Sequence, residues 1–135
     1  MNMLIDANIL LDVLQERKPH VQASSLIWKL CETGQAHGTV CAFSFLNLVY
    51  IMRKELDARS IQSVLEQLDL IFDFADLQIE DIEKAAALAW PDYEDAVQYA
   101  TADRICADVI ITRNVRDYKD SRISVMTPEE YLKNL

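Results

Sequence analysis

Short apolar runs alternate along the chain with longer segments in which apolar residues recur at helical spacing. The first run covers residues 3–5 and stops at Asp6, and the apolar residues after it, from Ile9 to Leu14, recur with a helical period. This pattern predicts a buried strand that turns directly into a helix. The same pattern predicts further strands over 38–43, 72–77, 108–112 and 123–126, and helices over 19–34, 44–56, 58–72, 82–90, 92–107 and 127–135.

Residues typical of helix ends accompany these segments. Ser44 and Asp92 stand where helix starts are predicted, and Thr127 precedes a proline at the start of the last helix. Gly34 follows the second helix, where glycine is the usual stop signal. We therefore expect Ser44, Asp92 and Thr127 to be the N-terminal caps of their helices.

Strands and helices alternate from one end of the chain to the other. Such alternation is typical of a parallel sheet covered by helices on both faces. We therefore predict an α/β fold, a three-layer α/β/α sandwich around a central parallel sheet of four to five short strands. With 135 residues and no internal repeat or linker, residues 1–135 are expected to form a single domain.

Composition narrows the class of protein. A hydrophobic content of 51% is enough for a folded core, and no apolar run approaches the length of a membrane span. The three cysteines are widely spaced and form no metal-binding pattern, so we expect reduced, mostly buried thiols in a cytoplasmic protein. Only two glycines occur, which excludes a glycine-rich phosphate loop.

The net charge of −9 bears on possible partners. A protein that binds nucleic acid by bulk electrostatics is expected to be basic. This chain either does not bind nucleic acid or binds it through a local basic patch and bound cations. Arg113, Arg116 and Lys119 are candidates for such a patch, and a solvated surface is the alternative interpretation.

Polar residues gather at the predicted strand ends and at the helix starts that follow them. In a parallel sheet the carboxyl ends of the strands meet at one edge, where ligands bind. The residues concerned are Asp6, Asn47, Asp92, Asp95, Thr112, Asn114 and Asp117.

Carboxylates brought together repel one another, and divalent cations relieve that repulsion. Oxygen ligands without paired histidines or cysteines favour Mg²⁺ or Mn²⁺, and such an ion can support phosphodiester hydrolysis. Each residue also has a structural alternative, since Asp6, Asp92 with Asp95, and Ser44 with Asn47 all resemble helix caps. The other acids are expected on solvated helix faces or near helix N-termini, namely Asp12, Glu16, Glu80, Asp81, Glu83, Glu129 and Glu130.

Three segments together resemble the PIN-domain family. They are Asp6-Ala7-Asn8 within 4–11, the segment 95–100, and Thr112-Arg113-Asn114-Val115-Arg116-Asp117-Tyr118 within 107–118. Their order and spacing fit the family over the whole chain. The resemblance implies an α/β/α sandwich and a Mg²⁺- or Mn²⁺-dependent endoribonuclease, as in the VapC-like toxins of toxin–antitoxin pairs. It also implies an RNA substrate, an antitoxin protein and a homodimer.

The resemblance also implies roles for individual residues. Asp6, Asp95 and Asp117 are implied as catalytic metal ligands, with help from Asn114 and Asn47. Asn8, Thr112 and Asp92 are implied as supporting residues, Asn8 by orienting the turn after the first strand and Thr112 by steadying the site.

This chain departs from the family at two acidic positions, which are occupied by Asn47 and Asn114. Fewer charges weaken the affinity for cations, so one well-held ion is expected more readily than two. Two hypotheses follow. The chain is a ribonuclease, or it is a catalytically weak or inactive PIN-like module that binds RNA or a partner protein.

Overall fold

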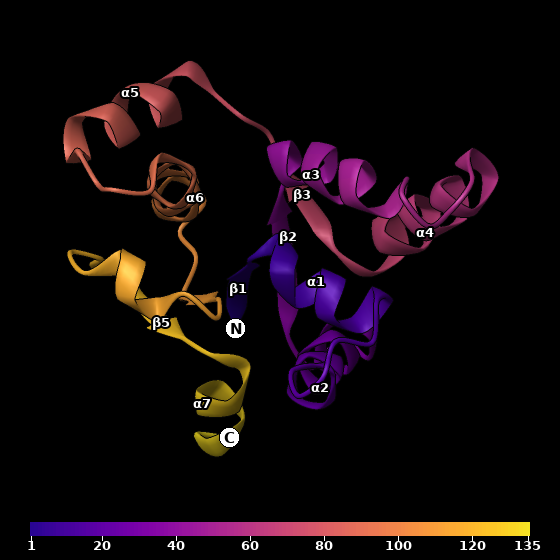
Figure 1. Ribbon diagram of the computed structural model, residues 1–135. Coiled ribbons are helices and arrows are strands. Elements are labelled where there is room, and N and C mark those ends of the chain that lie inside the picture. Colours follow the sequence, from indigo (N-terminus) through magenta and orange to yellow (C-terminus); the bar gives the residue numbers. More distant parts are fainter.

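A central five-stranded parallel sheet organises the computed structural model, which describes residues 1–135 (Figure 1). The strand order across the sheet is β3-β2-β1-β4-β5. The fold predicted from the sequence is therefore confirmed, with five strands. These are β1 (Asn2–Ile5), β2 (His37–Cys41), β3 (Asp73–Ala75), β4 (Val109–Ile111) and β5 (Ser124–Met126).

Helices connect the strands, as the sequence pattern predicts. They are α1 (Ala7–Leu14), α2 (Val21–Glu32), α3 (Ala42–Met52), α4 (Ala58–Ile71), α5 (Ile79–Leu88), α6 (Tyr93–Arg104) and α7 (Pro128–Lys133), with a 3₁₀ turn η1 (Val115–Tyr118). Asp92 and Thr127 cap α6 and α7 as expected, each accepting a hydrogen bond from the amide three residues later. None of these helices is both long and apolar enough to cross a lipid bilayer.

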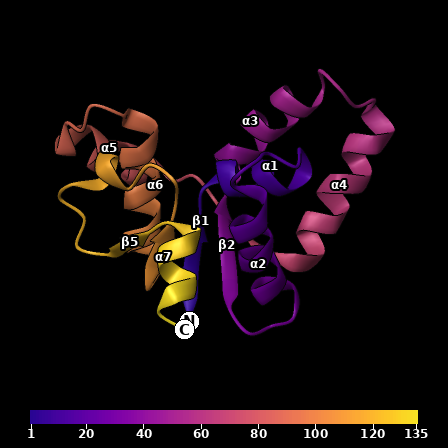
Figure 2. The same ribbon diagram turned by 60° about the horizontal axis from the view of Figure 1, so that its bottom comes forward.

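Two helical layers enclose the sheet. Helices α1 to α4 lie on one side of it and α5 and α6 on the other (Figures 1 and 2). The handedness of the connections explains this division. The chain steps from β1 to β2 to β3 in one direction, then returns across the sheet to β4, so the return crossover places its helices on the opposite face.

Strand residues alternate between the two cores. Met3 and Ile5 pack in the larger core, with residues of α1, α2, α3 and α4, whereas Leu4 packs in the smaller core with Tyr99 and Ala102 of α6. In β4, Val109 and Ile111 face the larger core and Ile110 the smaller one. Because side chains in a strand point alternately to its two faces, a sheet buried on both sides has a continuously apolar central strand, as in β1 and β4.

The point where the strand order reverses lies between β1 and β4, which pair with Ile5 opposite Ile111. Ligands bind at such a point in open α/β sheets, outside the carboxyl ends of the strands. Asp6 directly follows β1 and Thr112 directly follows β4. The fold therefore brings both residues to the position where this architecture places its ligand sites.

Two expectations for helical residues are wrong. Helix α3 begins at Ala42, immediately after β2, so Ser44 is a buried residue of its first turn and not its cap. Asp12 is fully buried and not solvated. Its carboxylate accepts hydrogen bonds from Ser24 Oγ and Arg113 Nη2, both at 3.0 Å, and these partners make its burial tolerable.

Candidate functional site

Asp6 serves two structural roles at the end of β1. Its Oδ1 accepts a hydrogen bond from the Asn8 backbone amide and so caps α1, while its Oδ2 accepts one from the Thr112 hydroxyl at 2.8 Å. The Thr112 hydroxyl oxygen in turn accepts a hydrogen bond from the backbone amide of Asn114 at 3.1 Å. These bonds hold the segments after β1 and β4 together. Thr112 contacts Asp6 through its side chain and Asn8 does so through its backbone amide, and their supporting roles stay predictions.

Asp95 enters the site from the opposite helical layer. It lies in the first turn of α6 with 7% of its surface exposed, and its backbone amide donates to the Asp92 carboxylate at 3.0 Å. Its Oδ1 accepts a hydrogen bond from the Tyr118 hydroxyl at 3.2 Å. Its Oδ2 is buried and has no hydrogen-bond partner. A buried carboxylate oxygen without a donor is costly, which marks Asp95 Oδ2 as a position that needs a positive ligand.

Three carboxylates converge at this point. Asp92, Asp95 and Asp117 each place one oxygen within 4.8 Å of the others, Asp95 being buried and the other two exposed. Burial, followed by the negative charges of Asp92 and Asp6, raises the pKa of Asp95 to about 7. Burial also raises the pKa of Asp6. The cluster therefore holds more negative charge than its surroundings neutralise.

The predicted ligand set overlaps this cluster without being identical to it. Asp95 and Asp117 are members, and Asp92, expected as a supporting residue, is the third. Asp6 is not a member, but its charge acts on both Asp95 and Glu94, so it lies in the same electrostatic environment. Asp6 therefore remains a predicted ligand, and Asp92 is added as a candidate.

The two asparagines occupy different positions around the cluster. Asn47 is exposed on α3, and its side-chain amide donates to Glu94 Oε1 at 2.7 Å. Asn114 is exposed at the start of η1, and its backbone amide is held by Thr112. Both predicted ligands thus border the rim at the carboxyl ends of the strands. Through this hydrogen bond Asn47 holds the Glu94 carboxylate beside the rim, and Glu94 was not among the residues predicted from the sequence.

The basic residues after β4 differ in their surroundings. Arg113 pairs with the buried Asp12 carboxylate at 3.0 Å, and its Nε is buried without a partner. This contact gives Arg113 a structural role that the sequence did not indicate. Arg116 and Lys119 are exposed and line a cavity of about 220 Å³ together with Asp117. They remain the better-placed candidates for phosphate contacts.

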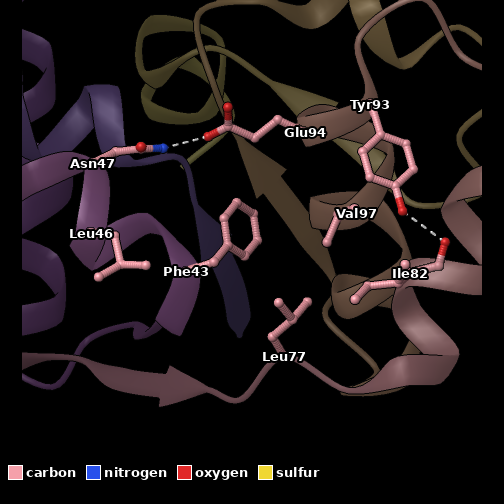
Figure 3. A pocket seen from close by; sticks show the side chains of 8 residues that line it. All are labelled: Phe43, Leu46, Asn47, Leu77, Ile82, Tyr93, Glu94 and Val97. Atoms are coloured by element: carbon pink, nitrogen blue, oxygen red, sulfur yellow. Dashed lines mark hydrogen bonds between the residues drawn. The ribbon is translucent and has the colours of Figure 1, made fainter.

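An apolar groove of about 390 Å³ adjoins the acidic cluster (Figure 3). Phe43, Leu77 and Val97 point toward one another across it, and the Asn47–Glu94 hydrogen bond closes the end next to the site. Several of its apolar side chains are well exposed, including Leu46 at 76%. An exposed apolar surface rimmed by polar groups is typical of an interaction site.

The donor set fits a hard divalent cation. All converging ligand atoms are carboxylate oxygens, and the buried Asp95 Oδ2 is unpaired. Mg²⁺ and Mn²⁺ prefer oxygen ligands, and no histidine or cysteine belongs to the cluster. The geometry therefore supports cation binding between the starts of α6 and η1.

Sequence analysis missed three residues of this site. Glu94 was overlooked although it directly precedes Asp95, and Gln98 lies three positions after Asp95, on the same face of α6. Helical spacing alone could have indicated Gln98. Tyr118 was noted only as an aromatic after Asp117, because no pattern shows which way a hydroxyl points.

Comparison with protein families gives one match, to a model described as a PIN domain, over residues 2–116. No protein of curated function matches the sequence. The family match spans β1 to β4 and ends within η1, so it includes Asp6, Asp92 and Asp95 and stops one residue before Asp117.

Several solved structures share the fold of this chain. A toxin–antitoxin complex from Klebsiella pneumoniae matches with a TM-score of 0.72 and 21% identity, over 93% of this chain and 97% of that one. VapBC2 from Rickettsia felis, bound to a DNA fragment from its promoter, matches with a TM-score of 0.66 and 14% identity, over 93% of this chain and 97% of that one. FitAcB from Neisseria gonorrhoeae matches with a TM-score of 0.62 and 14% identity, over 94% of this chain and 98% of that one. At these identities the matches show the fold.

Proposed function

The chain belongs to the PIN-domain family, and on that basis we propose that it is a Mg²⁺- or Mn²⁺-dependent endoribonuclease, the toxin of a toxin–antitoxin pair. One observation carries the proposal. The buried and unpaired Asp95 Oδ2 lies in a cluster of carboxylates at the reversal point of the sheet. Such an arrangement is costly unless a cation neutralises it.

Each residue of the proposed site has a distinct proposed role. Asp6, Asp95 and Asp117 are the proposed catalytic ligands, Asn114 and Asn47 assist, and Asp92 joins them because its oxygen lies in the cluster. One or two divalent ions bound there would polarise the scissile phosphate and activate water for hydrolysis. Thr112 holds Asp6 in place through its hydroxyl.

The negative net charge of the chain would repel RNA. A cation bound at the site would neutralise the carboxylates that lie next to the RNA backbone and so allow binding. Arg116 and Lys119, exposed beside Asp117, are proposed to contact the flanking phosphates. Because only a few cationic side chains take part, RNA binding should depend modestly on salt concentration.

Removal of divalent metal tests the proposal. Purified protein is expected to cleave single-stranded RNA in Mn²⁺ or Mg²⁺, to stop when EDTA is added, and to recover when excess Mn²⁺ is restored. RNA fragments separated on denaturing gels are the readout. Cleavage that continues at the same rate in EDTA would contradict metal dependence.

A second candidate is an inactive module that binds RNA or a partner, and Asn47 and Asn114 at usually acidic positions favour it. Calorimetric titration with Mn²⁺ separates the two. The nuclease should bind Mn²⁺ and lose that binding in Asp95→Asn. An inactive module should show no Mn²⁺ binding and no cleavage.

We further propose an antitoxin as partner, because the solved structures with this fold include toxin–antitoxin complexes. The apolar groove beside the rim is the proposed docking surface for one of its segments. An RNA substrate and such a partner imply action in the cytoplasm. A homodimer is also proposed, and light scattering of the purified protein measures it.

A charge placed in the groove should weaken antitoxin binding. Leu77→Glu is expected to lower affinity for the proposed antitoxin by about tenfold or more, since apolar anchors dominate such interfaces. Leu70→Glu is the control, because Leu70 is 87% exposed on α4 and does not line the groove. Biolayer interferometry gives both affinities. Equal affinities for the two variants would place the docking surface elsewhere.

A further inference from the structure

Tyr118 controls how Asp95 presents its carboxylate. We propose that the Tyr118 hydroxyl biases Asp95 toward ligation through one oxygen and so makes the site discriminate against Ca²⁺ in favour of Mg²⁺ and Mn²⁺. This inference rests on the proposed metal site and adds a selectivity determinant to it.

The hydrogen-bond chain from Gln98 fixes the direction of the hydroxyl proton. Gln98 Nε2 donates to the Tyr118 oxygen at 2.7 Å, and the Tyr118 hydroxyl donates to Asp95 Oδ1 at 3.2 Å. A phenol has one proton to donate. Because Gln98 supplies a donor from one side, that proton is directed to Asp95.

The surroundings keep this arrangement in place. Tyr118 is 3% exposed and Gln98 is 4% exposed. The Tyr118 ring packs edge-on against Trp90, with 5.7 Å between ring centroids. Both side chains are buried, so the hydrogen bond from Tyr118 to Asp95 Oδ1 is kept in place. Oδ2 is left as the one Asp95 oxygen without a partner.

A carboxylate with one free oxygen suits some cations better than others. Ca²⁺ takes six to eight oxygen ligands and readily accepts both oxygens of a carboxylate, whereas Mg²⁺ requires octahedral geometry with few protein carboxylates. Oδ1 keeps a second lone pair, but its bond to Tyr118 fixes the carboxylate plane and makes Oδ1 the poorer ligand, so two-oxygen ligation by Asp95 is disfavoured. The smaller ions are therefore favoured.

Selectivity measured by calorimetry tests the inference. Mn²⁺ and Ca²⁺ are titrated separately into the parent, Tyr118→Phe and Tyr99→Phe. Tyr118→Phe removes the hydroxyl and keeps the ring against Trp90. Tyr99→Phe is a matched control, because Tyr99 also packs on Trp90 but its hydroxyl oxygen accepts the Arg122 amide and does not contact Asp95.

The ratio of Kd for Ca²⁺ to Kd for Mn²⁺ should fall by about tenfold in Tyr118→Phe, the scale typical of residues that orient metal ligands. It should not change in Tyr99→Phe. Gln98→Met, which removes the donor behind Tyr118, should lower the ratio by a smaller factor and serves if Tyr118→Phe fails to fold. If the parent binds Mn²⁺ and the ratio of the two Kd values is the same in the parent and in all variants, this inference alone is overturned. A parent that binds no Mn²⁺ overturns the proposed metal site with it.

Discussion

Asp6→Asn should reduce Mn²⁺-dependent RNA cleavage by about 100-fold or more while the fold is retained. Asparagine keeps the size of the side chain and can still cap α1 through its amide oxygen, while its amide nitrogen takes the place of the oxygen that accepts the Thr112 hydroxyl. The substitution therefore removes the negative charge and the acceptor of the Thr112 hydroxyl. Loss of activity would show that the charge of Asp6 serves the reaction.

Cleavage rates for the parent and variant are measured at saturating RNA, and circular dichroism checks the fold. Asp69→Asn is the control, since Asp69 is exposed on α4, outside the site. Its rate should equal that of the parent. An Asp6→Asn protein that cleaves as fast as the parent would remove Asp6 from the proposed ligand set.

Asp12→Ala should lower the free energy of unfolding by about 3–5 kcal/mol, the range for breaking a buried ion pair from one side. Asp12 is fully buried, and its two oxygens bind Arg113 and Ser24, with Arg17 at 3.9 Å. Its removal leaves the Arg113 guanidinium partly buried beside an empty position. Because Arg113 follows Thr112 directly, the loop at the site should loosen as well.

Urea unfolding followed by circular dichroism measures this loss. Asp69→Ala is the matched control and should change stability by less than about 0.5 kcal/mol, as surface substitutions usually do. A loss below about 1 kcal/mol in Asp12→Ala would show that the ion pair contributes little beyond the cost of burying it.

The architecture was predictable from the sequence because its signals are local. Apolar runs that stop at polar residues gave all five strands, and the caps at Asp92 and Thr127 gave the starts of α6 and α7. The pattern also predicted Asp117 at the carboxyl edge of the sheet, because parallel strands end at a common edge, whereas Asp95 reaches it from the start of α6, which strand ends alone do not determine. The strand pattern also placed Thr112 at this edge, the resemblance gave it a supporting role, and its hydroxyl contacts Asp6 in the structure.

The remaining features depend on contacts between distant residues. Asp12 was assigned to solvent because an acid on a short helix is usually exposed, and its partner Arg113 lies 101 positions away. The start of α3 was misplaced because β2 leads into it without a side-chain cap. The hydrogen bond from Tyr118 to Asp95 spans 23 positions and depends on one hydroxyl orientation.

The proposed ligands belong to both helical layers. Asp6 begins α1 on one face of the sheet, and Asp95 lies in the first turn of α6 on the other. The distance between Asp6 and Asp95 therefore depends on how the two helical layers pack against the sheet. A change in core volume under α6, for example at the fully buried Ala102, would shift one wall of the site relative to the other without altering any of its ligands.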